Sequence, residues 1–307
     1  MIVIGGEALV DLVPASTADG PLAPLHPRLG GGPYNVAITL GRQGVPVGFH
    51  GRISTDPLGE ALLDRLTESA VDTELVQRGP EPTTLAVVGL AADGGARYSF
   101  HTRDTAAPLV RPAELPAHCT ALCLGTLGLV LEPGATVYEQ ALFRAAEQGR
   151  FTALDPNVRA GMIADPDAYR ARFESWLPAV DLLKLSEEDA RWLSPDEPVV
   201  DAVRRWRDAG PRAVVLTRGG DGLLVLAGEE PVSVPAPATA VADTIGAGDT
   251  VQGSLLAWLH REGALDADAL TGLDWHRALR HAAAAAAITV SRPGAEPPWS
   301  AELAPGG

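Results

Sequence analysis

Residues 241–250 read Val-Ala-Asp-Thr-Ile-Gly-Ala-Gly-Asp-Thr and run directly into an apolar, helix-periodic segment over residues 251–259. We expect a turn of small residues here, followed by a buried helix that begins near Ala247. The first backbone N–H groups of a helix have no intrahelical partner and carry partial positive charge. Because Gly246 and Gly248 lack a Cβ, an anion can approach those N–H groups closely. The stretch therefore predicts an anion site at the start of a late helix.

Asp249 follows the two glycines and would lie beside the bound anion. A carboxylate at such a place suits phosphoryl transfer, in which an aspartate accepts the proton of the attacking hydroxyl. An acid near a helix start is also a common N-terminal cap. Taken alone, the stretch leaves the catalytic and the structural interpretation equally open.

Composition restricts the choice of partners. The 307-residue chain can bury a full hydrophobic core, and its formal net charge of −15 argues against a nucleic-acid partner. No apolar run approaches the length of a membrane span, and the first residues read as a strand and not as a signal peptide, so we expect a cytoplasmic protein without a membrane partner. The only lysine is Lys184, and no GxxxxGK[ST] motif occurs. A phosphate site must therefore use backbone N–H groups, arginine or Lys184.

Zinc or redox chemistry is not expected from the cysteines and histidines. Cys119 and Cys123 lie in an apolar, strand-like run and are predicted to be small buried core residues. The seven histidines show neither an HExxH motif nor another paired metal spacing.

Short β-rich runs alternate with longer helical ones, which predicts an α/β fold with a mostly parallel central sheet flanked by helices. No internal repeat or long linker divides the chain, so we expect a single domain over residues 1–307. The runs at 83–90 and 97–101 flank Ala-Asp-Gly-Gly, a hairpin signal. We predict a small antiparallel β lid built from about 12–29 and 80–107, with an extended edge of the main sheet as the alternative. An exposed lid edge could pair with a second copy in a homodimer.

Polar residues follow several predicted strands. Asp11 lies at the exit of the first β region. It could be an ordinary charged loop residue or bind a hydroxyl of a polyol, and the sequence favours neither interpretation. The glycines at 30–32 precede a helix start at Pro33, and Asn35 offers both a donor and an acceptor to a hydroxylated ligand. Residues 155–159 follow another strand, at the edge where open α/β sheets bind ligands.

Three later segments could serve structure or a nucleotide. The acids at 187–189 lie in the first turn of a helix, where they suit the helix dipole. The glycine turn at 218–222 could direct N–H groups toward phosphate. The alanine run at 282–287 predicts a closely packed helix, whose small side chains could equally form the wall against a flat ring.

Two signatures make the chain similar to the ribokinase-like (PfkB) carbohydrate kinases along nearly its whole length. The first joins residues 30–37 to residues 51–59, and the second is 243–249, with supporting matches at 155–159, 217–222 and 292–295. The resemblance implies a ribokinase-like α/β fold with a β lid. It also implies ATP-dependent phosphorylation of a sugar's primary hydroxyl in the presence of Mg²⁺.

The same resemblance implies roles for individual residues. Asp249 would be the general base, beside an anion hole formed by the N–H groups of Gly246, Ala247 and Gly248. The sugar would be held by Asp11, Gly31, Gly32, Asn35 and Arg159. The nucleotide would be bound by Lys184, Ser186, Thr217, Gly219 and Gly222, with Ala283 near adenine. Asp189 would act indirectly on Mg²⁺, and Asp243 would bind a monovalent cation, such as K⁺, that supports the anion hole.

The chain departs from the family pattern in three places. Ser186 and Asp189 stand where the family often has the Asn and Glu of an Asn-x-x-Glu motif, which puts the metal role in question. Gly32 and Tyr34 replace frequent alanines of the sugar signature, and Ala283 stands where some members have Asn.

Among the family's substrates we expect fructose. Residues 6–11, the lid segment that ends at Phe100-His101, and residues 155–159 resemble those of fructokinases. The 2-keto-3-deoxygluconate kinases share Arg159, which could pair with a substrate carboxylate through two hydrogen bonds. Ribokinase is a further alternative, and a non-catalytic sugar- or nucleotide-binding protein is the alternative from another class.

Overall fold

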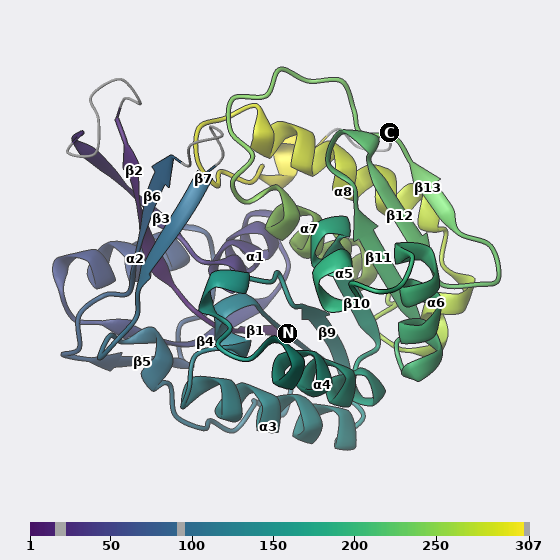
Figure 1. Ribbon diagram of the computed structural model, residues 1–307, viewed down its shortest axis with the longest axis horizontal. Coiled ribbons are helices and arrows are strands. Elements are labelled where there is room, and N and C mark those ends of the chain that lie inside the picture. The colour runs from purple at the N-terminus through teal and green to yellow at the C-terminus, as the bar shows by residue number, and fades with distance from the viewer. Residues whose placement is uncertain (16–22, 91–95, 304–307) are drawn as a thin grey trace.

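The computed structural model describes residues 1–15, 23–90 and 96–303 (Figure 1). Its main sheet has nine strands in the order β13-β12-β11-β10-β9-β8-β1-β4-β5. Seven of them are mutually parallel: β1 (Ile2–Gly5), β4 (Val47–Ser54), β5 (Val76–Gly79), β8 (Ala121–Gly125), β9 (Phe151–Asp155), β10 (Leu182–Ser186) and β11 (Ala213–Thr217). The last two, β12 (Leu223–Leu226) and β13 (Val232–Val234), complete the edge as antiparallel strands. The predicted mostly parallel sheet is confirmed.

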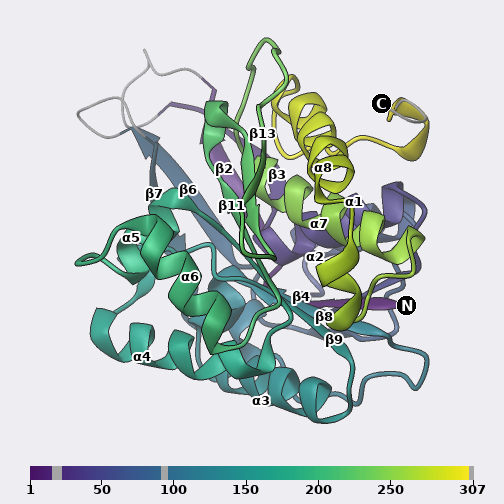
Figure 2. The same cartoon turned by 90° about the vertical axis from the view of Figure 1, so that its right-hand side faces the viewer.

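Helices cover both faces of this sheet (Figure 2). One hydrophobic cluster packs α3 (Gly134–Glu147), α4 (Pro166–Trp176), α5 (Glu187–Leu193) and α6 (Val199–Ala209) against one face. A second packs α1 (Gly32–Arg42), α2 (Pro57–Glu68), α7 (Ala247–Arg261) and α8 (Trp275–Val290) against the other. Burial on both faces explains why the central strands are continuous apolar runs without alternation. The cysteines at 119 and 123 are buried and free, as predicted.

Helix α7 begins at Ala247, where the sequence predicts it, and is packed tightly against its neighbours. A Cβ added at Gly253 would lie 2.6 Å from the Cβ of Thr39, so α7 and α1 are in close contact. The hydroxyls of Thr250 and Thr289 are 2.9 Å apart and join α7 to α8. This packing brings together the starts of α1 and α7, which carry the two sequence signatures.

A separate four-stranded sheet, here called the small sheet, projects beside the main one (Figure 1). Its order is β3 (Leu25–Gly30), β2 (Leu9–Pro14), β6 (Leu85–Leu90) and β7 (Ala96–His101). The pairs β2–β3 and β6–β7 are antiparallel, whereas the central pair β2–β6 is parallel. The predicted lid is thus two hairpins joined side by side. The tip of the second hairpin, at 91–95, and residues 16–22 lie outside the described residues.

Helix α2 begins with the predicted cap. Asp56 accepts a hydrogen bond from the Gly59 N–H at 2.8 Å, and Pro57 occupies the first helical position. The same carboxylate also accepts from the N–H and hydroxyl of Thr83, at 2.8 and 2.6 Å. Asp56 therefore ties α2 to the segment that leads into β6.

Among the described residues, no helix combines the length and apolar character needed to cross a membrane.

Candidate active site

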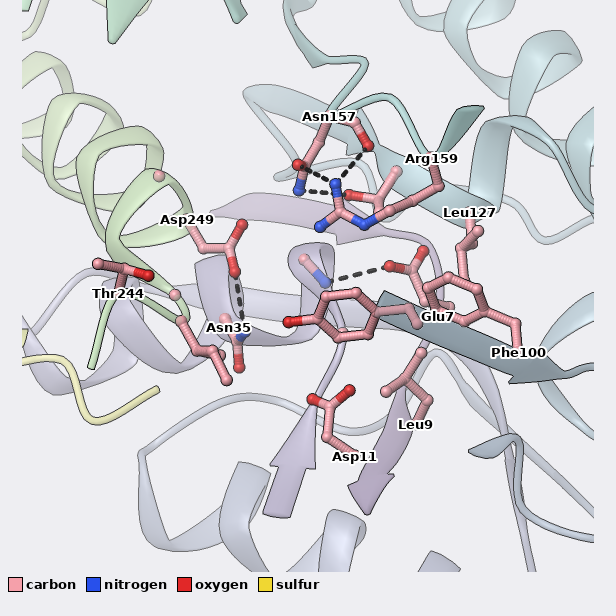
Figure 3. A pocket seen from close by; sticks show the side chains of 17 residues that line it. Glu7, Leu9, Asp11, Asn35, Phe100, Leu127, Asn157, Arg159, Thr244 and Asp249 are labelled. Atoms are coloured by element: carbon pink, nitrogen blue, oxygen red, sulfur yellow. Dashed lines mark hydrogen bonds between the residues drawn. The ribbon is translucent and has the colours of Figure 1, made fainter. Parts of the chain in front are cut away.

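A cavity of about 240 Å³, here called the polar cavity, lies between the small sheet and the carboxyl ends of the main-sheet strands (Figure 3). The β1–β2 turn, the start of α1, the segment after β9 and the start of α7 all contribute to its walls. The predicted residues that line it are Asp11, Gly31, Gly32, Asn35, Arg159, Gly246, Gly248 and Asp249. The fold therefore gathers residues that lie up to 238 positions apart in the chain, from Asp11 to Asp249 (249 − 11).

Asp249 is buried in the first turn of α7 and is oriented by α1. The Asn35 side-chain amide donates to its Oδ2 at 2.8 Å, while Asn35 Oδ1 is buried and has no hydrogen-bond partner among the described residues (Figure 3). Burial raises the pKa of Asp249 above its usual value, and the Asn35 hydrogen bond and the charges of Lys184 and Arg159 oppose that rise. The site thus holds a carboxylate with one oxygen fixed by an amide.

The turn before α7 requires glycine. Gly246, at the N-cap, has φ = 77°, and a Cβ there would lie 2.6 Å from the Cβ of Ala295. A Cβ at Gly248 would lie 2.9 Å from the ammonium nitrogen of Lys184. The Ala247 N–H donates to the Thr244 carbonyl at 3.3 Å. At the start of α7, the glycines thus leave the backbone accessible, and the ammonium group of the chain's only lysine lies next to it.

Lys184 extends from β10 and forms a buried ion pair with Asp155 at the end of β9. Its Nζ is 2.7 Å from Asp155 Oδ2, and the other oxygen of this carboxylate is buried with no partner in the part of the chain that the structure describes. Burial alone would lower the pKa of Lys184, but Asp155 reverses this effect and raises it above its usual value. Lys184 is therefore charged, and its ammonium nitrogen lies close to Gly248.

A second cavity of about 440 Å³, here called the apolar cavity, lies on the other side of the α7 start. It is lined by the predicted nucleotide residues Thr217, Gly219, Gly222 and Ala283. Val251, Ala286, Ala287 and Val290 form an apolar wall of the kind that suits a flat ring. Thr244 and Gly248 line both the polar and the apolar cavity, so the two cavities meet at the first turn of α7.

The sequence matches the family described as "pfkB family carbohydrate kinase" over residues 1–302. The chain belongs to this family of carbohydrate kinases. It is similar to a fructokinase of Rhizobium leguminosarum bv. trifolii, 37% identical over 286 residues that cover 92% of this chain and 86% of the relative.

Two solved structures have the same ribokinase-like fold. A fructokinase from Xylella fastidiosa with bound ATP aligns with a TM-score of 0.86 at 25% identity, covering 96% of this chain and 93% of that one. A fructokinase from Vibrio cholerae O395 in its fructose-, ADP- and calcium-bound form aligns with a TM-score of 0.82 at 25% identity, covering 96% and 94%.

In this kinase Ser186 and Asp189 form a reciprocal cap at the start of α5. Ser186 Oγ accepts from the Asp189 N–H at 3.0 Å, and the Ser186 N–H donates to Asp189 Oδ2 at 3.0 Å. Asp189 Oδ1 accepts from the Val158 N–H at 2.8 Å. Both carboxylate oxygens therefore have protein partners, and Asp189 fixes the segment that carries Arg159. Ser186 and Asp189 line a third cavity, of about 810 Å³, and not the apolar one.

Asp243 braces the turn before α7. Its Oδ1 accepts from the Ile245 N–H at 3.0 Å, and its Oδ2 accepts from the Gly294 N–H at 2.9 Å. The carboxylate thus holds this turn against the C-terminal segment, next to Ala295. Across the described ranges, no group of three or more His, Cys, Asp or Glu side chains could hold a metal ion.

Sequence reasoning assigned no role to several residues that line the polar cavity: Glu7, Leu9, Tyr98, Phe100, Thr126, Leu127, Asn157, Thr244 and Ile245. Two of them have strained backbones, because Thr126 and Asn157 are non-glycine residues at φ = 53° and 38°. The Asn157 amide donates to Thr126 Oγ1 at 3.1 Å, and Arg159 Nη1 donates to Asn157 Oδ1 at 2.7 Å (Figure 3). No local signal marks such turns, since the strain arises only when the two segments meet.

Proposed function

We propose that this carbohydrate kinase transfers the γ-phosphoryl group of ATP to a primary hydroxyl of a small sugar, with fructose as the first candidate. The observation that carries the proposal is the junction of the two cavities. Asp249 faces the polar cavity, and Gly248, one residue away, lines both cavities. A sugar hydroxyl in one cavity and a nucleotide phosphate in the other would therefore meet beside a carboxylate.

In the proposed reaction, Asp249 accepts the proton of the attacking hydroxyl while that oxygen bonds to the γ-phosphorus and the bond to the β-phosphate oxygen breaks. The Asn35 amide keeps one oxygen of Asp249 in place, so the other is available for the proton. Negative charge on the transferred group is stabilised by the N-terminus of α7 and by Lys184, without rearrangement of either. Closure of the small sheet as a lid would exclude water from this junction.

The charges of the polar cavity favour a neutral sugar. Asp11 and Asp249 contribute carboxyl groups to it, whereas Arg159 is the one cationic side chain among the described residues that line it. Burial raises the pKa of Asp11 to about 6, so Asp11 is still ionised near pH 7. A sugar acid would add a further negative charge, which supports fructose over 2-keto-3-deoxygluconate. The Vibrio cholerae relative, whose structure contains fructose, supports the same choice.

For the nucleotide, the apolar cavity fits an adenine-sized ring, with the glycine turn at 219–222 near the phosphates. Within the described ranges, no cluster of acidic, histidine or cysteine side chains could hold a metal ion, and both carboxylate oxygens of Asp189 already accept hydrogen bonds. We therefore propose that Mg²⁺ is held mainly by the phosphates, as is common for this ion. A K⁺ ion near Asp243, a homodimer formed through the lid edge and a cytoplasmic location remain predictions.

The test measures ADP release with fructose, ribose, 2-keto-3-deoxygluconate and nucleosides, in the wild type and in Asp249→Asn. We expect fructose to be the best acceptor and the variant to lose roughly four orders of magnitude in kcat, as removal of a catalytic acid–base group does. Asp201→Asn is the matched control, because Asp201 lies in the first turn of α6 and is exposed. Normal turnover by Asp249→Asn would refute the mechanism, and a better acceptor than fructose would refute the substrate.

A further inference from the structure

Glu7 is a buried acid in the polar cavity that the proposed reaction does not use. It lies in the turn between β1 and β2, and only 2% of its surface is exposed. In Figure 3 its carboxyl group lies among the residues that line the cavity, near Phe100 and Leu127. A buried glutamate is costly unless its oxygens find partners.

Both oxygens of Glu7 have backbone partners on different wall segments. Oε1 accepts from the N–H of Gly32, the first residue of α1, at 3.1 Å. Oε2 accepts from the N–H of Gly128, in the short turn after β8, at 2.9 Å. Gly32 also lies against Thr126 and Asn157, because a Cβ there would be 2.3 Å from Thr126 Oγ1. Glu7 therefore joins its own turn to two other walls of the cavity.

The protonation state of Glu7 decides what it offers to a ligand. Burial raises its pKa to about 8, against the opposing effect of its backbone hydrogen bonds and of Arg159. A protonated carboxyl group carries one O–H donor, and both hydrogen-bond partners of Glu7 in the described residues are themselves donors. The O–H group therefore needs an acceptor from the cavity, such as an oxygen of a bound sugar.

Among the described residues, no other titratable side chain is hydrogen-bonded to Glu7. The Tyr138 hydroxyl, from α3, already donates to the carbonyls of Gly6 and His50. Arg159 is a donor only, and its charge favours ionised Glu7. Asp11 and Asp249 face the same cavity from β2 and α7, so ionisation of Glu7 adds a third negative charge there.

We propose that Glu7 is a further sugar-binding residue, which braces Gly32 and Gly128 and donates its carboxylic O–H to an oxygen of the acceptor sugar. The inference rests on the proposed sugar-kinase function. It gives the kinase an O–H donor in a cavity that the carboxyl groups of Asp11 and Asp249 also line. Sugar binding should then weaken as pH rises through about 8, where the donor is lost and a charge is gained.

The experiment measures the KM for fructose, the KM for ATP and kcat from pH 7 to pH 9.5. In the wild type we expect the KM for fructose to rise about tenfold across this range, the worth of one hydrogen bond, while the KM for ATP changes little. Asp11 is ionised throughout this window and does not contribute to the change. Calorimetric titration with fructose alone gives the same affinity without turnover.

The decisive variant is Glu7→Gln, which keeps a donor but cannot ionise. We expect its affinity for fructose to be independent of pH over the same range, although it is weaker at pH 7 because one backbone N–H loses its acceptor. Glu139→Gln is the control: Glu139 accepts from Trp176 at 2.7 Å and from Arg172 at 2.9 Å, away from the cavity. It should lower the melting temperature and keep the wild-type pH dependence.

The outcomes separate the two proposals. A wild-type affinity for fructose that is flat from pH 7 to pH 9.5 would overturn the role of Glu7, and so would an unchanged pH dependence in Glu7→Gln. The wild-type curve decides the matter even if Glu7→Gln does not fold. Failure of every sugar to bind or to release ADP would instead overturn the kinase proposal, and the role of Glu7 with it.

Discussion

Three acidic residues of the site are buried, and each of the three is held by a specific partner. Asp249 receives the Asn35 amide, Asp155 receives the ammonium group of Lys184, and Glu7 receives two backbone N–H groups. Burial raises the pKa of all three carboxyl groups, while these partners oppose the rise. The partner of each acid therefore decides in which pH range the acid is ionised.

We expect kcat to increase with pH because Asp249 acts as a base only when ionised. Its pKa is raised above the usual value for aspartate, so the increase should occur at a higher pH than for an exposed aspartate. Asn35→Ala removes the hydrogen bond that lowers this pKa and should move the increase to still higher pH. The measurement is kcat at saturating fructose and ATP from pH 4.5 to pH 8.5.

The control for this variant is Thr39→Val, one turn further along α1, where the hydroxyl donates to the Asn35 carbonyl at 2.8 Å. It should leave the pH of the kcat increase unchanged. A kcat that falls with pH in the wild type, or an Asn35→Ala profile displaced to lower pH, would contradict the assignment of Asp249 as the base.

Asp249, Asn35 and the glycines at 31 and 246 could be recognised from the sequence, because each lies in a local pattern that a helix start requires. Glu7 and Thr126 could not be recognised as members of the site, and for Asn157 only its segment, 155–159, was predicted to lie at the ligand-binding edge of the sheet. Their importance depends on contacts between separate segments, such as Glu7 with Gly128, 121 positions apart, and Thr126 with Asn157, 31 positions apart. For Asp189, the sequence already indicated a place in the first turn of a helix, whereas the reciprocal cap that it forms with Ser186 is seen only in the structure.

At the scale of elements, the start of α7 is fixed by the C-terminal segment and by α2. Ala295 lies against Gly246, and its carbonyl accepts from Arg65 of α2 at 2.6 Å. Arg65 and Arg42 both pair with Glu296, at 3.1 and 2.8 Å. The glycine-containing turn before α7 is therefore held by residues outside the helix that it begins.

Gly246→Ala should strongly reduce kcat, since the added Cβ clashes with Ala295 and displaces the turn. The loss should be on the order of a hundredfold, comparable with removal of an oxyanion-hole donor. The control is Gly263→Ala, just beyond the other end of α7, where φ is 66° and a Cβ would meet nothing within 4 Å. Both substitutions cost about 1–2 kcal/mol of backbone strain in the free energy of unfolding. Equal kcat values for the two variants would contradict the role of the turn.

Asp56→Ala should destabilise the protein by about 1–2 kcal/mol in the free energy of unfolding, as loss of a good helix cap does. Burial raises the pKa of Asp56, but its hydrogen bonds with Thr83 and Gly59 together outweigh burial and lower the pKa below the usual value. This stabilisation is therefore present at neutral pH and is lost as pH falls through the lowered pKa. Denaturant unfolding at pH 7 and pH 3 should show a difference between wild type and variant that shrinks at pH 3.

Asp165→Ala is the matched control for Asp56→Ala. Asp165 caps α4 by accepting hydrogen bonds from the N–H groups of Asp167 and Ala168. Among the described residues, none of its hydrogen bonds reaches the small sheet. We expect it to reduce stability without changing the KM for fructose. A KM for fructose that also stays constant in Asp56→Ala would show that its link to Thr83 does not support the lid.

Local patterns predicted most elements, including the start of α7, the cap of α2 and the hairpin of β6 and β7. They did not reveal that β2 and β6 pair in parallel, since the two strands are separated by about 70 residues. Nor could they give the order of the nine strands, which is set by tertiary packing. Alternation of strands and helices predicts the class of fold, and the resemblance to a family implied the ribokinase-like arrangement with a β lid.

At the scale of the molecule, two cavities that meet at one helix start should make stability depend on ligands. A ligand that binds only the folded state stabilises it by about 2.7 kcal/mol at a hundred times its Kd. We expect fructose at that concentration to raise the free energy of unfolding by this amount, measured by denaturant unfolding. Sucrose at the same concentration is the control, because it shares the general osmolyte effect but is too large for a cavity of about 240 Å³. Equal stabilisation by both sugars would contradict a specific site.

The burial of Lys184 has a practical consequence for chemical modification. It is the only lysine of the chain, and 3% of its surface is exposed in the folded protein, where Asp155 keeps it protonated. Acylating reagents require a neutral, accessible ε-amine. They should therefore not react with Lys184 until the strands around it separate. The fraction of Lys184 that carries the tag, measured by mass spectrometry, would then give the fraction of molecules in which the strands around Lys184 have separated. No other lysine contributes to this signal.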